Sequence, residues 1–280
     1  MLNLASPKKS SGFGLFLKTV QGRAYPRVVG MLREKTWMFF DIFLPLLSVS
    51  AFALMYKAIG APEEYLGFVV IGGAMTSFWM NVLWAMSSQL YWEKETGNLP
   101  LYILSPASLM GILLGMAVGG WFSTLLRAVV IIAIGSWIFE VTYVVSSLSQ
   151  LLWIFFLCMG ALYGLGMMTA SFFLLLSREA WHLANLASEP VYLISGMYFP
   201  VKNLGFWTGA FASFIPLTLG LDAMRQVSFA NGALLGFLDV KLEIMVLAAL
   251  FVVYLVSSYF LIKYIEKLAI REGRLTENKR

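Results

Sequence analysis

The stretch Leu109–Phe139 reads LMGILLGMAVGGWFSTLLRAVVIIAIGSWIF and contains one charged residue, Arg127. An α-helix rises about 1.5 Å per residue, so roughly 20 residues cross a hydrocarbon core of about 30 Å. This stretch is long enough to cross a bilayer as one helix and to tilt or project beyond it. The sequence around it therefore has to be interpreted as that of a membrane protein.

The composition of the whole chain agrees with this interpretation. Hydrophobic residues make up 60% and charged residues 12% of the 280 residues, against about 45–50% and about 25% in soluble domains. One soluble core could not bury so much apolar surface, so we predict an all-α polytopic membrane protein. A single cysteine and a single histidine exclude an intrachain disulfide and a Cys-cluster metal site, and no metal is expected.

Six stretches are apolar and long enough, or nearly so, to span the membrane. They are Met38–Ile59, Leu66–Trp92, Leu109–Phe139, Leu148–Leu176, Leu183–Phe199 and Ile244–Ile265. The fifth stretch is short and ends at Pro200, and the apolar sequence over 201–214 is interrupted by Gly205 and Gly209. Counting that interrupted segment as a span would give seven.

The distribution of lysine and arginine decides between six and seven spans. Fifteen cations lie before the first predicted span, in the second and fourth connections and in the tail, whereas four lie in the opposite loops. Because positive residues favour the cytoplasmic side, both termini are expected there, which requires an even number of spans. The sequence thus predicts a multi-pass protein of the cell membrane with six spans over 38–265.

The two ends of the chain are basic. Within the N-terminal segment 1–37, Phe13, Leu17, Val20 and Ala24 recur at helical spacing. This spacing predicts an amphipathic helix lying on the inner leaflet, although a merely solvated basic arm is the alternative. Residues 266–280 are expected to form a basic cytoplasmic tail.

Charged residues inside the predicted spans are few: Asp41, Arg127 and Glu189. An ion-coupled secondary transporter normally carries a chain of such groups near the middle of the membrane. Structural pairing, or snorkelling of Arg127 toward the outer face, is the simpler interpretation of these three. G-x-x-x-G repeats at 111–119 and 160–164 predict close helix packing, either within one subunit or across a dimer.

Two further segments are polar or broken where a membrane protein need not be. Residues 91–108, YWEKETGNLPLYILSPAS, connect the second and third spans on the predicted cytoplasmic side. They predict a short helix across the inner face with charges available to another protein. Near the outer surface, SGMYFP at 195–200 is followed by IPLT at 215–218 and DAMR at 222–225.

With these two motifs in order, the chain resembles the type-2 ABC exporter permease superfamily. Members of that family carry a Glu-Gly cytoplasmic loop ending near Ser-Pro and a Ser-Gly…Pro…Pro-Leu…Arg pattern before the last span. The resemblance covers nearly the whole chain. One departure is Pro100, where many relatives have a polar residue.

The resemblance implies a homodimeric or heterodimeric pore driven by a separate ATP-binding subunit, with ATP and Mg on that partner. No G-x-x-x-x-G-K-[ST] loop occurs in this chain, so it is expected to bind no cofactor and to be no enzyme by itself. In the coupling loop, 92–108, the residues expected to dock the ATPase are Glu93, Glu95, Gly97 and Asn98. Arg178 and Glu179 are expected to form a second, smaller contact.

Lipid cannot satisfy the backbone groups freed at the prolines and glycines of 200–225. We therefore expect short re-entrant outer helices there that cap the exit as a gate, with a static packing element as the alternative. The predicted gate residues are Ser195, Gly196, Phe199, Pro200, Phe214, Pro216 and Arg225. Arg225 is expected to anchor at the outer headgroups, and Phe199, Phe206, Trp207 and Phe214 are expected to form an apolar plug.

The spans are rich in phenylalanine, methionine and tryptophan, which favours an apolar or amphipathic substrate, a drug or a lipid. Since aromatic rings also stack on sugars, a lipid-linked polysaccharide or glycan is the alternative, and an ion-coupled secondary transporter is a more distant one. Membrane lipids are expected partners, and nucleic acid is not.

Overall fold

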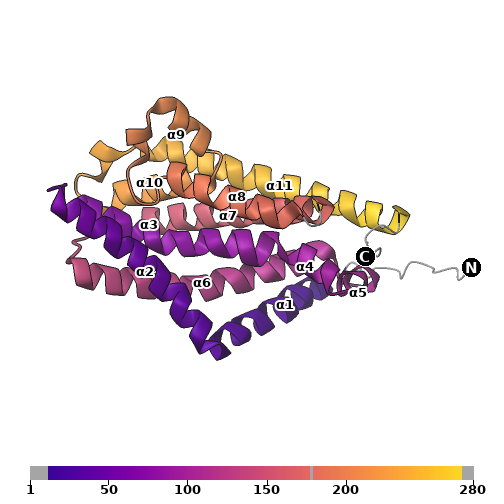
Figure 1. The fold of residues 1–280 in the computed structure, drawn as a ribbon. Coiled ribbons are helices and arrows are strands. Elements are labelled where there is room, and N and C mark those ends of the chain that lie inside the picture. Colours follow the sequence, from indigo (N-terminus) through magenta and orange to yellow (C-terminus); the bar gives the residue numbers. More distant parts are fainter. Residues whose placement is uncertain (1–11, 177–178, 273–280) are drawn as a thin grey trace, which may run out of the picture.

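The computed structural model describes residues 12–176 and 179–272, and within these ranges it contains helices and no strand. In chain order the elements are α1 (Phe13–Arg33), α2 (Lys35–Ala58), α3 (Glu64–Met80), η1 (Asn81–Ser87), α4 (Gln89–Glu95), α5 (Leu99–Leu104), α6 (Leu109–Phe139), α7 (Leu148–Leu176), α8 (Glu179–Ile194), η2 (Val201–Leu204), α9 (Phe206–Ala212), α10 (Pro216–Ser228), η3 (Gly232–Leu235) and α11 (Val240–Glu272). Figure 1 shows them as an elongated bundle.

Five helical stretches of the described chain are long and apolar enough to cross a membrane. They are Lys35–Ala58, Glu64–Glu95, Leu109–Phe139, Leu148–Leu174 and Val240–Leu268. These correspond to five of the six predicted spans. The remaining predicted span contains α8, whose 16 residues extend only about 24 Å at about 1.5 Å per residue. The chain is a multi-pass membrane protein, and α8 is the element on which the sixth span depends.

The second stretch lies at the centre of the bundle. Nearly every residue of α3 from Leu66 to Trp79 is buried, because α2, α6 and α10 all pack on it. A helix that is apolar on all sides has to be surrounded in this way or face lipid. Its continuation, η1, is a π-helical segment, and α4 then carries the chain to the end of the bundle.

The helix predicted near the N-terminus is present as α1 and packs lengthwise against α6. The glycine row of α6 makes this possible: a Cβ on Gly115 would lie 2.6 Å from the Val20 carbonyl oxygen, and one on Gly119 would lie 2.9 Å from that of Ala24. Of the predicted apolar stripe, Phe13 and Leu17 are exposed, while the backbone at Val20 and Ala24 lies against α6. The close approach of two backbones, rather than side-chain hydropathy, selects the face of α1 that is covered.

The G-x-x-x-G repeats therefore pack within one subunit. The repeat in α7 behaves like that in α6, because Gly160 faces the Phe251 ring and Gly164 faces Tyr254, both in α11. The alternative that these glycines lie at a dimer interface was wrong for both repeats.

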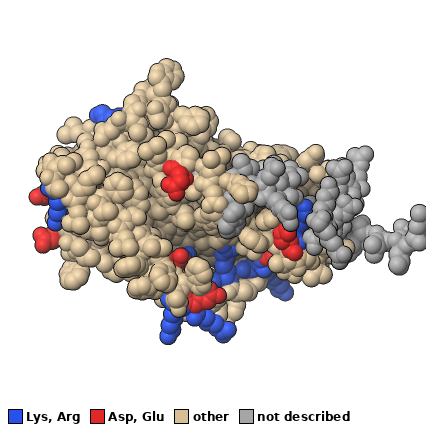
Figure 2. Space-filling view, in the orientation of Figure 1, with Lys and Arg blue, Asp and Glu red and all other residues tan. Residues whose placement is uncertain are grey.

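The two ends of the bundle differ. The start of α1, the hairpin of α4 and α5 and the end of α11 lie at one end, while α9 and α10 lie at the other (Figure 1). At the first end the Leu109 amide donates a 3.1 Å hydrogen bond to Glu266 Oε1, tying the start of α6 to α11. Figure 2 shows a largely uncharged surface, with Lys and Arg gathered over the corner between α1 and α2.

Candidate functional site

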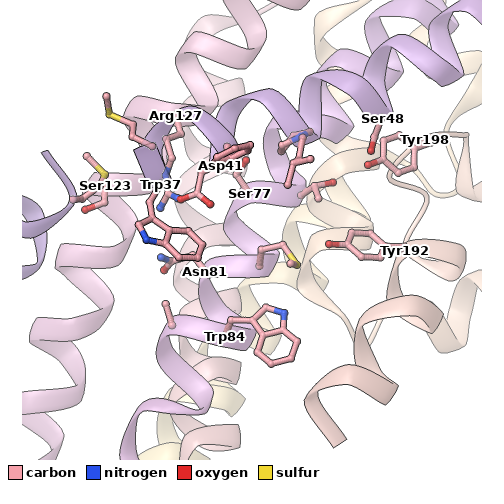
Figure 3. Close-up of a pocket in the computed structure, with 18 of the residues that line it drawn as sticks. Trp37, Asp41, Ser48, Ser77, Asn81, Trp84, Ser123, Arg127, Tyr192 and Tyr198 are labelled. Atoms are coloured by element: carbon pink, nitrogen blue, oxygen red, sulfur yellow. The ribbon is translucent and has the colours of Figure 1, made fainter. Parts of the chain in front are cut away.

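A cavity of about 1020 Å³ lies among α1, α2, the α3–η1 helix, α6, α8 and the turn after α8. Figure 3 shows its lining. The residues around it are Arg27, Met31, Glu34, Trp37, Met38, Phe40, Asp41, Leu44, Pro45, Ser48, Phe52, Thr76, Ser77, Met80, Asn81, Trp84, Ala85, Ser123, Arg127, Glu189, Tyr192, Leu193, Tyr198 and Phe199. Fourteen of these 24 residues are apolar or aromatic and ten are polar, five of them charged, a combination that can hold a small molecule and fix its orientation.

One end of this cavity holds an ion pair between Arg127 of α6 and Asp41 of α2. Arg127 also donates through Nη2 to Thr124 Oγ1 at 3.4 Å. Arg127 is thus paired inside the bundle, and snorkelling to the outer face is not its arrangement. Since an unpaired charge in hydrocarbon is costly, this pair fixes α2 against α6 beside the cavity.

The π-helical turn of η1 forms part of the cavity wall through Asn81 and Trp84 (Figure 3). Asn81 Oδ1 accepts a 3.1 Å hydrogen bond from the Tyr163 hydroxyl of α7. Ser87 Oγ and Thr169 Oγ1 lie 2.5 Å apart one turn further on. A π-turn widens a helix locally and often occurs at functional sites, and here side-chain hydrogen bonds from α7 hold it in place.

Arg27 of α1 also lines the cavity. Its Nη2 donates to the Ala85 carbonyl oxygen at 2.5 Å, so α1 is attached to the same π-turn. Burial lowers the pKa of the Arg27 guanidinium to about 10, which leaves it protonated at neutral pH.

The opposite end of the cavity is closed by the turn after α8. The Tyr198 ring stacks on Phe52 of α2 with centroids 4.4 Å apart and planes 9° apart. The Tyr56 hydroxyl donates to the Tyr198 carbonyl oxygen at 2.9 Å. Tyr198 and Phe199 of this turn therefore line the cavity, and the turn is held against α2 through Tyr198.

The predicted coupling loop forms two short helices, α4 and α5, joined at Gly97, which has φ +77°. Pro100 lies in the first turn of α5, where the missing N–H costs nothing. Glu95, Gly97 and Asn98 are exposed and available to a partner.

Glu93, which was expected to dock the ATPase, is buried at the junction of α1, α4 and α5. It is 6% exposed and forms an ion pair with Arg23 of α1. Gln89 Nε2 donates to its Oε1 at 2.9 Å, and Asn98 Nδ2 donates to its Oε2 at 3.1 Å. Glu93 therefore organises the junction of α1, α4 and α5, because the helix that precedes the loop continues far enough to turn this carboxylate inward.

The second predicted coupling contact is only partly within the described chain. Arg178 lies outside the described residues, and Glu179 begins α8. Nothing in the structure tests a docking role for either residue.

Arg225 was wrongly expected to anchor at the lipid headgroups, because its side chain is buried, with 1% exposure. It donates to the carbonyl oxygens of Gly196 at 2.5 Å, Met197 at 2.7 Å and Phe68 at 2.7 Å. Ser195 is buried beside this network. The predicted turn at Gly196 is present, with φ +70°.

The expected apolar plug is absent within one subunit. Phe206, Trp207 and Phe214 are 62%, 84% and 67% exposed, because α9 projects from the bundle end (Figure 1). Pro200 and Pro216 instead mark the starts of η2 and α10, and Phe199 lines the cavity.

Comparison with known families completes the description. The model of the family described as "ABC-2 type transporter" matches residues 27–229 of this chain, which includes the cavity, the α4–α5 hairpin and the buried Arg225. The chain belongs to the ABC-2 type transporter family. This family consists of transporter permeases that associate with an ABC ATP-binding subunit.

Individual relatives of this ABC-2 permease are distant. It is 25% identical over 177 residues to the "Probable multidrug ABC transporter permease YbhR" of Escherichia coli strain K12 and equally to that of strain O157:H7. The matched region covers 61% of this chain and 46% of each relative. The chain therefore spans less than half the length of these curated relatives.

Most residues lining the cavity of this ABC-2 permease were not predicted from the sequence. Of the predicted gate residues, only Phe199 lines it, while Asp41, Arg127 and Glu189 were noted as charges inside spans. The sequence contained one signal for this cavity: the small polar residues Ser48 and Asn81 lie inside apolar spans.

Proposed function

We propose that this chain is the membrane subunit of an ATP-driven exporter that moves an apolar or amphipathic substrate, a drug or a lipid. The observation that carries this proposal is the cavity of about 1020 Å³ in a member of the ABC-2 family. Its aromatic lining suits an amphipathic molecule, and the name of the matched E. coli relatives, a probable multidrug permease, agrees with this class.

The proposed topology has six spans, with both termini in the cytoplasm. The protein would lie in the plasma or inner membrane of the cell. The cation asymmetry supports this topology, as does the place of α8 in the chain between α7 and the α9–α10 segment, with contacts to both α7 and α9. Exposed apolar side chains on α1 and α2 would contact membrane lipids. The helices over 200–225 would lie at the outer side.

Energy would come from a separate subunit that binds ATP and Mg, and the working unit would be a dimer of this chain with a second copy or a paralogue. Glu95, Gly97 and Asn98, exposed around the α4–α5 turn, would dock that subunit, and Arg178 and Glu179 would form a second, smaller contact. Because α4 continues directly from η1, a push on the α4–α5 hairpin would reach the wall of the cavity. The chain would carry no catalytic residue.

A lipid-linked glycan is the second candidate substrate. Trp37, Trp84 and Tyr192 line the cavity together with Ser48 and Asn81. Aromatic faces combined with hydrogen-bonding side chains are also what a sugar requires, so this alternative rests on the same lining.

The test is purification of the tagged chain under mild detergent with its ATP-binding subunit, followed by reconstitution in liposomes. We expect co-purification and ATP-dependent movement of a fluorescent amphiphile, and no ATP hydrolysis by this chain alone. A complex containing an ATPase subunit that binds but does not hydrolyse ATP is the control. Substrate movement that continues unchanged with that control, driven by an ion gradient, would overturn the proposal.

A further inference from the structure

Glu189 of α8 is a carboxylate on the cavity wall without a counter-charge. It is exposed, it lines the cavity, and no hydrogen bond or ion pair joins it to another described residue. A charge on an apolar span is costly unless it is paired or faces a polar ligand or water. The position of Glu189 therefore points to a ligand rather than to a structural role.

The charges of the lining do not balance. The lining contains three carboxylates, Glu34, Asp41 and Glu189, and two guanidiniums, Arg27 and Arg127. Asp41 and Arg127 form an ion pair. Arg27 donates to the Ala85 carbonyl oxygen, and no ion pair joins it to Glu34 among the described residues. Three carboxylates against two guanidiniums leave the lining with one negative charge in excess, and Glu189 is the carboxylate that α8 contributes.

The surroundings of Glu189 are aromatic. Tyr192 lies three residues further along α8, on the same helix face, and also lines the cavity. Figure 3 shows Tyr192 and Tyr198 together, away from the end that holds Asp41 and Arg127. The faces of tyrosine rings attract cations, so the carboxylate and the rings both favour a positively charged ligand.

Resting on the proposed function, we propose that this cavity selects amphipathic monocations, with the cationic group held between Glu189 and the rings of Tyr192 and Tyr198. The apolar part of the molecule lies along the wall formed by Trp84, Phe52 and Leu44. Anionic amphiphiles of the same shape are rejected, because they would bring a second negative charge to Glu189.

The test uses the purified full chain in lipid nanodiscs and two probes of nearly identical shape and opposite charge, tetraphenylphosphonium and tetraphenylborate. Binding is measured by equilibrium dialysis against empty nanodiscs. We expect the cation to bind more tightly than the anion. Glu189→Gln should weaken cation binding about tenfold, the scale of losing one charged contact, and Glu189→Asp should restore part of it. Glu63→Gln, an exposed carboxylate outside the cavity, is the matched control and should change nothing.

Ser48→Trp, which places a large aromatic ring in the cavity from its wall, separates this inference from the proposed function. If it abolishes binding of both probes while Glu189→Gln changes neither, the cavity is a ligand site but the charge selection is wrong. Equal binding of the two probes by the native chain also overturns the selection. If Ser48→Trp changes no binding, the cavity is not the ligand site, and the proposed function loses the observation that carries it.

Discussion

The Arg225 guanidinium and the Gly196 carbonyl oxygen are joined by a hydrogen bond of 2.5 Å between residues 29 positions apart in the chain. The turn containing Gly196 also touches the central helix, since a Cβ added at Gly72 would lie 1.5 Å from the Met197 carbonyl oxygen. A broken backbone inside a membrane protein needs internal partners for its carbonyl groups. One buried arginine supplies them to four carbonyls, those of Gly196, Met197, Phe68 and, at 3.4 Å, Phe199.

Replacing Arg225 by methionine should destabilise the protein strongly. Burial lowers the pKa of Arg225 to about 10, so the guanidinium is charged at pH 7, and its loss leaves buried carbonyls without donors. We expect a loss of roughly 3 kcal/mol or more in the free energy of unfolding, seen as a lower melting temperature in detergent. Lys202→Ala removes an exposed hydrogen bond to the Leu234 carbonyl oxygen and should cost less than about 1 kcal/mol. Equal melting temperatures for the two variants would contradict the role of Arg225.

The packing of α1 on α6 can be tested at Gly115. A Cβ at this position would lie 2.6 Å from a backbone oxygen of α1 and 2.8 Å from the Arg23 Cβ, so Gly115→Leu should separate the two helices. We expect faster proteolysis near α1 and a lower melting temperature. Gly22→Ala is the control, because nothing lies within 4 Å of its Cβ position, and alanine favours a helix by roughly 1 kcal/mol over glycine. A Gly115→Leu protein as protease-resistant as the native one would contradict the close packing of α1 on α6 at this glycine.

The sequence predicted the long helices well because their signal is local. Leu109–Phe139 and Leu148–Leu176 coincide with α6 and α7, and the two ends of the Glu64–Glu95 stretch differ from the predicted span by a few residues. Apolar length alone determines such segments. The close packing predicted at Gly111–Gly119 was also correct, although which helix fills the groove could not be known.

The errors concern residues whose position depends on distant partners. The resemblance implied a docking role for Glu93, and Arg225 was expected to anchor at the outer headgroups. Their burial depends on Arg23, 70 positions away, and on carbonyl groups of the turn after α8. The π-turn at η1 has no local sequence signal, because it follows from contacts such as the Tyr163–Asn81 hydrogen bond.

The ion pair of Arg23 and Glu93 predicts a charge-swap result. Glu93→Arg should lower the free energy of unfolding by roughly 1–3 kcal/mol. This is less than for a fully buried ion pair, because the Arg23 side chain is 31% exposed and solvent screens the pair. Arg23→Glu combined with Glu93→Arg should recover a large part of that loss in a thermal melt. A double variant no more stable than Glu93→Arg alone would show that the pair itself contributes little.

Glu95 provides the contrast at the same hairpin. Its side chain is exposed, so Glu95→Lys should leave the melting temperature unchanged while weakening co-purification of the ATP-binding subunit, since like charges would replace complementary ones. Glu63→Lys, also exposed but in the connection before α3, should leave co-purification intact. If both variants lose the ATPase subunit, or if neither does, the α4–α5 hairpin is not the docking site.

The six-span topology is testable with single cysteines at three exposed positions, Lys57, Glu95 and Lys202. The buried native Cys158 is replaced by alanine. In intact cells a membrane-impermeant maleimide should label Lys57→Cys and Lys202→Cys, whereas Glu95→Cys should react only after permeabilisation. Labelling of Lys202→Cys that requires permeabilisation would mean that α8 does not cross the membrane and that five spans remain.

The turn over the cavity predicts how the outer exit opens. Phe52 and Tyr198 stack with their ring centroids 4.4 Å apart, so cysteines at these two positions in a Cys158→Ala background can be joined by a short cleavable thiol cross-linker. If the turn has to separate from α2 to release substrate, the cross-linked complex should stop ATP-dependent transport while retaining most of its ATP hydrolysis. Reduction of the linker should restore transport. The same pair of cysteines left without linker controls for the loss of the two rings. Full transport by quantitatively cross-linked protein would make the turn a static packing element, because the exit would then open without moving Tyr198 away from Phe52.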